Sequence, residues 1–215
     1  MRDLLTFCER EQAWLLETIA ALVSRESPTH DKAAVDACGR ELQARLERLG
    51  ARVTRCPQAS VGDHLRAEFP PAPRGGDGRQ IMLLGHFDTV WDVGQLREMP
   101  LREEEGRLHG PGIYDMKAGI ALGALAIRAL QALDRMPPAP VVMVFTTDEE
   151  TGSATSRALV EAEARRSAAV LVLEPSLPGG ALKTARKGCG GYELVVRGVA
   201  AHAGIDPRKG ASAIR

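Results

Sequence analysis

The chain has 215 residues, enough for one ordinary domain and part of a second. Its 28 basic and 28 acidic residues give a formal net charge of zero, which argues against a protein that binds nucleic acid or another polyanion. The sequence has no apolar stretch long enough to span a membrane, so we expect no membrane partner. The apolar run at residues 19–23 is too short for a signal peptide.

The cysteines are widely spaced and form no CxxC pair. This spacing favours a reduced, cytoplasmic protein with buried thiols over a disulfide framework or a cysteine-based zinc site. The four residues are Cys8, Cys38, Cys56 and Cys189.

The first fifty residues have the periodicity of helices. Apolar residues recur at near-helical spacing over residues 1–24, and the sequence SPT at residues 27–29 interrupts them. A second helix is predicted over residues 31–49, with Gly50 as its C-terminal cap. We interpret both helices as structural.

Two short alternating segments, residues 52–55 and 64–69, predict strands. His64 lies in the second of them without a pattern of acidic neighbours, and we interpret it as structural. The Pro- and Gly-rich residues 70–78 predict a surface loop.

A buried strand is predicted over residues 81–85, and it ends at His86. Residues two apart on an extended chain point the same way, so His86 and Asp88 face one side. Asp88 can fix the second nitrogen of a metal-bound His86, directly or through a small backbone turn. Taken alone, the pattern favours a hydrogen-bonded histidine at a capped strand end.

Residues 117–133 are rich in small apolar side chains and predict a helix that packs close to a sheet. Asp115 falls at its expected N-cap position. Plain capping is worth about 1 kcal/mol, and the spacing alone favours it. The functional alternative is a rigidly held carboxylate that bridges two metal ions.

The segment at residues 141–152, VVMVFTTDEETG, predicts a buried strand that stops at three acids, Asp148, Glu149 and Glu150. Open α/β sheets place their sites at the carboxyl ends of strands. Three like charges there repel one another unless a cation holds them. We therefore expect a metal site at this edge.

A further buried strand is predicted over residues 168–173, after a helix that Ser153 caps and that runs to about residue 166. This strand ends at Glu174. Three predicted strands thus end at histidine or acids, and one shared site explains this better than independent accidents.

One histidine with several carboxylates suits zinc or a similar divalent ion. The donors exceed what one tetrahedral ion needs, so we expect two ions roughly 3.5–4 Å apart. Glu149 and Glu150 are neighbours and cannot easily share a role. One can bind metal while the other acts on water as a general base.

The motifs GHFDTVW, HGPGIYDMKAG, TTDEETGS and LEPS resemble, in order and spacing, those of the di-zinc peptidase and aminoacylase family. The stretch KTARKGCGGYELVVRGVAAHAGIDPRKGASAI is particularly similar to bacterial glutamate carboxypeptidases of the folate-cleaving type. The motifs cover most of the chain from about residue 80 onward.

The resemblance implies two Zn²⁺ ions or other divalent ions. His86 and Glu174 would bind one zinc and Glu150 the other. Asp115 would bridge the two ions, and Glu149 would be the general base.

The resemblance also implies that Asp88 orients His86. His202 would stabilise the oxyanion, often in the site of the partner subunit. The implied fold is α/β, with a mostly parallel central sheet, helices on both faces and the start of an inserted α+β lid.

We expect residues 1–187 to form an incomplete catalytic domain and residues 188–215 the beginning of a lid and dimerisation domain. Its first strand is predicted over residues 191–199 and a helix near Lys209. The family's final metal-binding histidine has no counterpart before Arg215. We therefore expect an N-terminal fragment that is inactive by itself and a homodimer when full length.

The expected activity is metal-dependent hydrolysis of an amide bond beside a free carboxylate, with release of C-terminal glutamate or a similar amino acid. The alternatives within this chemistry are an aminoacylase and an acyl-diamine deacylase. A non-catalytic interaction protein is a different class, and an intact Glu149 argues against it. A two-metal phosphoesterase would need a basic phosphate cradle, which the acid cluster lacks.

Overall fold

The computed structural model describes residues 2–72, 78–188 and 190–214. The chain forms two compact units, Met1–Pro175 and Ser176–Arg215.

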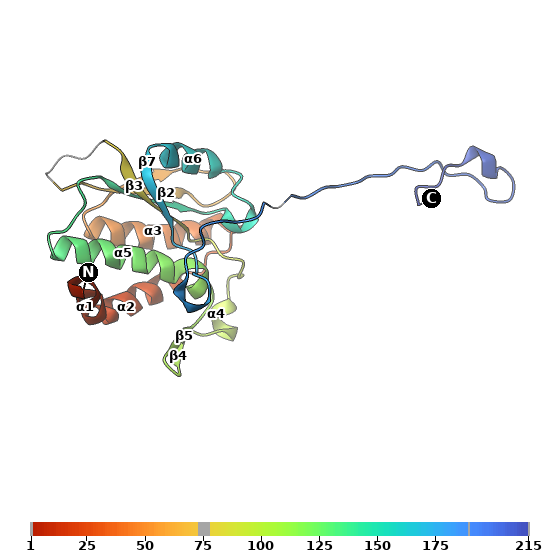
Figure 1. Ribbon diagram of the computed structural model, residues 1–215. Coiled ribbons are helices and arrows are strands. Elements are labelled where there is room, and N and C mark those ends of the chain that lie inside the picture. The colour runs from red at the N-terminus through yellow and green to blue at the C-terminus, as the bar shows by residue number, and fades with distance from the viewer. Residues whose placement is uncertain (1, 73–77, 189, 215) are drawn as a thin grey trace. The chain divides into compact units, whose positions relative to one another are not determined.

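The first unit is built around a five-stranded sheet with the order β1-β2-β6-β3-β7 (Figure 1). Strands β6, β3 and β7 pair in parallel, whereas β2 pairs antiparallel with both β1 and β6. The predicted α/β class is confirmed, with a sheet of mixed direction whose parallel part carries the strands that end in acids. The strands are β1 Arg52–Cys56, β2 His64–Phe69, β3 Gln80–His86, β6 Val141–Thr146 and β7 Ser167–Val172.

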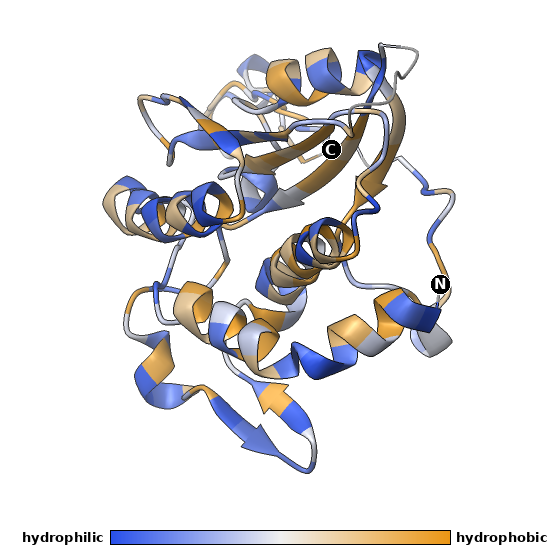
Figure 2. Ribbon diagram, turned by 90° about the vertical axis from the view of Figure 1, so that its left-hand side faces the viewer, coloured by the Kyte–Doolittle hydropathy of each residue, from blue (hydrophilic) through white to orange (hydrophobic). Residues whose placement is uncertain are grey.

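Helices cover both faces of this sheet. Successive residues of β6 point to opposite sides, and both sets pack against helices. Met143 and Phe145 join a core cluster that includes residues of α3 and α5. Val142 and Val144 lie in another cluster, against residues of α6. Figure 1 shows α3 and α5 on one side and α6 on the other, and Figure 2 shows the apolar strands between the helices. The helices are α1 Arg2–Arg10, α2 Gln12–Val23, α3 Lys32–Arg48, α4 Gln95–Glu98, α5 Ala118–Ala132 and α6 Arg157–Arg165.

A small hairpin, β4 Arg102–Glu104 with β5 Arg107–His109, follows α4. None of the helices in the described ranges has the length and apolar character that crossing a bilayer would require.

Two predictions of helix limits are wrong. The predicted single helix over residues 1–24 is two helices, α1 and α2, with a break at Glu11. Ser153 does not cap a helix; it has a φ of +58°, and α6 begins at Arg157. The reason is a side-chain hydrogen bond within this segment: the Asp148 carboxylate accepts from the backbone N–H groups of Thr155 and Ser156 and holds the chain there in a turn.

Strand β7 was predicted to be buried, and this prediction is also wrong. It is the edge strand, paired with β3 alone among the described strands. Leu171 and Val172 are 54% and 56% exposed. An apolar run indicates that a strand can be buried, but it does not show whether other strands or helices cover it.

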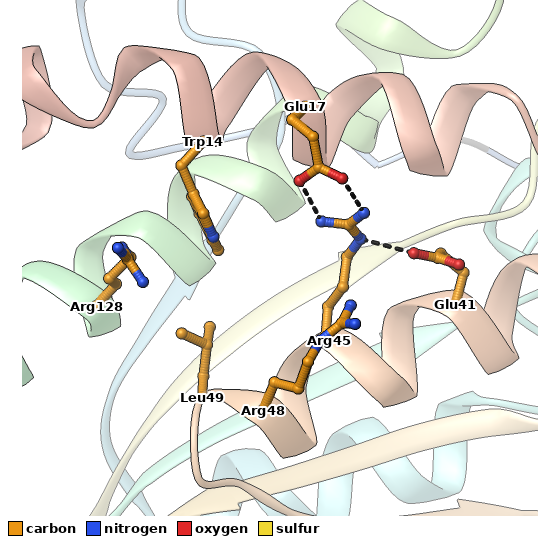
Figure 3. A pocket seen from close by; sticks show the side chains of 7 residues that line it. All are labelled: Trp14, Glu17, Glu41, Arg45, Arg48, Leu49 and Arg128. Atoms are coloured by element: carbon orange, nitrogen blue, oxygen red, sulfur yellow. Dashed lines mark hydrogen bonds and ion pairs between the residues drawn. The ribbon is translucent and has the colours of Figure 1, made fainter.

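Arg45 fastens α2 to α3. It is buried and donates two hydrogen bonds to Glu17, at 2.6 and 2.8 Å, and one to Glu41 at 2.8 Å. Figure 3 shows this clamp in the wall of an open pocket of about 360 Å³. The two helices are therefore held together by this contact as well as by the loop that joins them. The pocket is lined by Trp14, Glu17, Glu41, Arg45, Arg48, Leu49 and Arg128.

Helix α5 approaches the end of β7 through two glycines, which differ in what they touch. A Cβ on Gly119 would overlap the backbone carbonyl of Leu173, whereas a Cβ on Gly123 would meet the flexible Leu173 side chain at 3.0 Å. Alanine is the better helix former by about 1 kcal/mol. We expect the backbone clash to outweigh this gain in G119A and lower the free energy of unfolding by about 1–3 kcal/mol.

Urea denaturation of G119A beside G123A tests this expectation, since both variants add one methyl group to the same helix. We expect G123A to stay within about 1 kcal/mol of the wild type. A G119A variant as stable as G123A would contradict the close approach.

The second unit contains short turns at Pro178–Gly180 and Pro207–Lys209 and a single bridge between Val199 and Ala211. The predicted strand over residues 191–199 is not formed in the described residues, and Tyr192 is fully exposed. The unit begins at Ser176, ahead of the predicted boundary at residue 188. The assignment of residues 188–215 to a lid stays a prediction.

Candidate metal centre

Four chain segments bring polar side chains to the carboxyl edge of the parallel strands. His86 ends β3, Glu149 and Glu150 follow β6, and Glu174 follows β7. Asp115 comes from the segment Ile113–Lys117 just before α5. Since parallel strands end at the same edge, residues far apart in the sequence meet there.

His86 lies at the centre of this group. Its Nε2 atom is 3.0 Å from Asp115 Oδ1, 3.2 Å from Glu174 Oε1 and 3.9 Å from Glu149 Oε2. Two trios have possible ligand atoms that all lie within 4.8 Å of one another: His86 with Glu149 and Glu174, and His86 with Asp115 and Glu150. The structure thus brings together five residues that the sequence singled out.

Asp88 contacts the Nδ1 atom of His86, on the side of the ring away from the acids. The Nδ1 atom lies 3.1 Å from the backbone carbonyl of Asp88 and 3.4 Å from its Oδ1 atom. A proton on Nδ1 donated to that carbonyl leaves the Nε2 lone pair directed at the acids. Of the two routes predicted for Asp88, the backbone carbonyl makes the hydrogen bond and the carboxylate lies beside it.

Asp115 is not an N-cap, so that interpretation of the sequence was wrong. Helix α5 begins at Ala118 with Lys117 before it, and Asp115 has extended backbone angles, φ −119° and ψ 101°. A side chain in this conformation cannot reach the first free N–H groups of the helix. Its carboxylate instead reaches His86.

Asp148 differs from the two acids that follow it. Its Oδ2 atom accepts hydrogen bonds from the backbone N–H and the hydroxyl of Thr155, at 2.7 and 2.8 Å. Burial opposes ionisation of Asp148, but these bonds and those from Ser156 outweigh it and lower its pKa. Asp148 therefore shapes the turn, and Glu149 and Glu150 remain available to the site.

The electrostatics of the group favour a cation at its centre. Burial disfavours a charged His86, but the carboxylates of Asp88 and Glu174 outweigh this and raise its pKa to about 11. Burial, reinforced by neighbouring carboxylates such as Asp115, raises the pKa of Glu149 and of Glu150. The acids thus retain a proton on the imidazole, at the position that a metal ion would take.

The donor set fits a divalent metal. Imidazole with carboxylates suits zinc and similar ions. Four carboxylates this close together repel one another unless a cation lies among them. Asp88 Oδ1 is buried without a hydrogen bond, at 3.4 Å from the Nδ1 atom that carries the proton when Nε2 binds metal. The assignment of Glu150 to metal and Glu149 to proton transfer stays a prediction, because each belongs to one of the two trios.

Two other histidines have distinct surroundings. His64 is buried between the hydroxyl groups of Thr147 and Thr155, at 2.9 and 3.1 Å, as expected of a structural residue. His202 lies exposed in the second unit, where its Nδ1 accepts hydrogen bonds from the backbone N–H groups of Gly204 and Ile205. Its predicted role at the oxyanion stays a prediction.

The sequence pattern did not reveal the residues that support the site from outside. Thr29 donates a hydrogen bond to Asp88 over a separation of 59 residues, and Lys117 donates two, to the carbonyls of Leu22 in α2 and Arg25 in the following loop. The SPT triplet at residues 27–29 indicated only a helix break. No local spacing links it to Asp88.

An α/β sheet whose carboxyl edge gathers one histidine and four carboxylates defines a domain with a candidate carboxylate-rich metal centre. The chain belongs to peptidase family M20/M25/M40, whose sequence pattern matches residues 82–207. It is 34% identical to carboxypeptidase G2 of Pseudomonas sp. (strain RS-16) over 207 residues. This match covers 95% of this chain and 49% of that protein.

A second relative, acetylornithine deacetylase of Myxococcus xanthus, is 36% identical over 149 residues, which is 66% of this chain and 37% of the relative. The crystal structure of aminopeptidase PepT from Bacillus cereus ATCC 10987 supports the fold, with a TM-score of 0.69 and 24% identity, over 96% of this chain and 54% of that one. The chain therefore spans about half the length of carboxypeptidase G2. It matches a smaller share of the deacetylase.

Proposed function

We propose that the protein is a metal-dependent hydrolase that cleaves an amide bond beside a free carboxylate and releases C-terminal glutamate or a similar amino acid. The observation that carries this proposal is the convergence of His86 with Asp115, Glu149, Glu150 and Glu174. Membership of the peptidase family and the similarity to a carboxypeptidase support it.

The proposed ligands are divided between two Zn²⁺ ions or other divalent ions. His86 and Glu174 would hold one ion and Glu150 the other, and Asp115 would be a ligand to both. When bound, such ions polarise the substrate carbonyl and lower the pKa of a coordinated water.

Glu149 is the proposed general base and a catalytic residue. Its side chain is about half exposed, which lets it reach a water and the substrate. Burial and nearby carboxylates raise its pKa, the direction that proton transfer at neutral pH requires. Glu149 takes a proton from the attacking water and then passes it to the leaving amine. Asp88 fixes His86 throughout.

The remaining roles rest on the resemblance. His202 stabilises the negative charge that develops on the carbonyl oxygen, from the lid of a partner subunit. The working protein is a cytoplasmic homodimer, and its substrate is a small molecule or peptide with a free carboxylate.

The test is the hydrolysis of matched substrates by the full-length protein loaded with zinc. The substrates are an N-acyl glutamate and the same molecule with its α-carboxylate converted to an amide. We expect the first to be cleaved with a kcat/KM at least 100-fold higher. Equal cleavage of both would remove the requirement for a free carboxylate.

The second candidate is an N-acyl amino acid or acyl-diamine deacylase, which the identity to acetylornithine deacetylase favours. A second pair of substrates separates the two candidates: an N-acetyl amino acid other than glutamate and the same amino acid with a long acyl group. A deacylase prefers a short acyl group such as acetyl and tolerates amino acids other than glutamate. A non-catalytic interaction protein would bind zinc and cleave neither series.

A further inference from the structure

The carboxylate of Asp88 connects three parts of the metal centre. It is completely buried, and its Oδ1 atom lies 3.4 Å from His86 Nδ1. Its Oδ2 atom lies 3.4 Å from the backbone nitrogen of Glu150, which donates to it. A rotation of this carboxylate would therefore change the support of both His86 and the segment that carries Glu150.

One side chain outside the centre fixes that rotation. The hydroxyl of Thr29, in the loop between α2 and α3, donates a hydrogen bond to Asp88 Oδ2 at 2.8 Å. Thr29 is buried and Asp88 is inaccessible to water, so solvent offers no replacement donor. Among the described residues, Thr29 is the side chain that donates to Oδ2 of this carboxylate.

The loop that carries Thr29 is attached firmly to the segment that carries Asp88. The backbone N–H of Thr29 donates to Thr89, and that of Thr89 donates to Ser27, at 3.2 and 2.8 Å. The hydroxyl of Ser27 donates to the carbonyl of Phe87 at 2.6 Å. The two segments therefore pair like short parallel strands.

Lys117 attaches the same loop to the segment that carries Asp115. Its ammonium group is buried and donates to the carbonyls of Leu22 and Arg25, at 3.0 and 2.9 Å. These carbonyls belong to the end of α2 and the start of the loop. The loop between α2 and α3 thus contacts both sides of the centre, and Thr29 contacts the group behind the metal-binding histidine.

We propose that Thr29 is a positioning residue of the metal centre, which fixes the carboxylate of Asp88 and thereby aligns His86 and Glu150 for metal binding. This inference rests on the proposed function, because it assumes that the centre binds metal. Partners behind metal ligands commonly change metal affinity by 10–100-fold.

The test is the zinc affinity of the full-length protein, measured by competition with a chromophoric chelator. T29V removes the hydroxyl and keeps the shape, and we expect it to bind zinc at least tenfold more weakly than the wild type. T29S keeps the hydroxyl and is expected to restore affinity to within about threefold. T18V is the matched control, because Thr18 is a buried α2 threonine whose hydroxyl accepts a bond from Arg45.

A double-mutant cycle separates positioning from general stability. In a D88N background the additional effect of T29V on zinc affinity is expected to fall below about twofold, since Thr29 acts through Asp88. The thermal midpoints of the metal-free variants record any loss of stability, and T29A replaces T29V if T29V does not fold.

Three results would overturn the inference: a T29V that binds zinc like the wild type, a T18V that loses as much affinity as T29V, or a T29V effect of unchanged size in D88N. A full-length wild type that binds no zinc would instead overturn the proposed metal centre itself. The two failures are therefore distinguishable.

Discussion

Replacement of Glu149 by glutamine is expected to lower kcat of the full-length enzyme by about 10³-fold and to leave its zinc content nearly unchanged. General bases contribute about 10²–10⁴-fold to such reactions. Glu149 Oε2 is 3.9 Å from His86 Nε2, farther than the carboxylates of Asp115 and Glu174. The measurement pairs steady-state hydrolysis with metal analysis of the same preparation.

E150Q is the matched control, because it makes the same change at the neighbouring residue of the same turn. If Glu150 is the ligand, E150Q loses metal as well as activity, and added zinc partly restores turnover. The reverse pattern, with metal lost in E149Q and retained in E150Q, would exchange the two roles. The two ligand trios include one of these residues each, so the experiment decides between them.

Replacement of His86 by asparagine is expected to weaken zinc binding by at least 100-fold, because this imidazole belongs to both trios. A chelator should then lower the thermal midpoint of the wild type but not that of H86N. Ligands that bind only the folded state stabilise it by about 4 kcal/mol at 1,000 times their Kd. H64N is the matched control at a buried histidine whose partners are threonine hydroxyls.

The pH dependence of binding is a second measurement on the same variant. The carboxylates around His86 raise its pKa to about 11, so the metal-free imidazole is protonated throughout pH 6–8. Zinc needs the neutral nitrogen and displaces that proton, so the affinity of the wild type should rise about tenfold per pH unit from this group. In H86N the slope of log affinity against pH should fall by about one. An unchanged slope would show that another group releases the proton.

Much of the site followed from sequence order alone. Parallel strands end at one edge of a sheet, so an acid or histidine after each of three apolar runs suffices to predict convergence. His86, Glu149 and Glu174 were placed by that rule, and they lie within the predicted group. The limits of β2 and α3 also follow from local periodicity, and they match the prediction to within one residue.

Predictions that relied on one local cue were less successful. An acid before a small-residue helix indicated a cap at Asp115, and a serine after Gly152 indicated another at Ser153. In both places the side chains make other contacts: the Asp115 carboxylate contacts His86, and Asp148 accepts a hydrogen bond that closes the turn containing Ser153. A cap signal indicates one possible hydrogen bond and does not show which other side chain competes for the same segment.

The sequence by itself determined which residues could bind metal and at which edge of the sheet they meet, because the apolar runs and the residues that end them are local properties of the chain. Only the tertiary structure decided how those residues are held. The contact between Thr29 and Asp88 spans 59 residues, and that between Lys117 and Leu22 spans 95. Such contacts depend on how helices pack on a sheet, which no periodicity in the chain records.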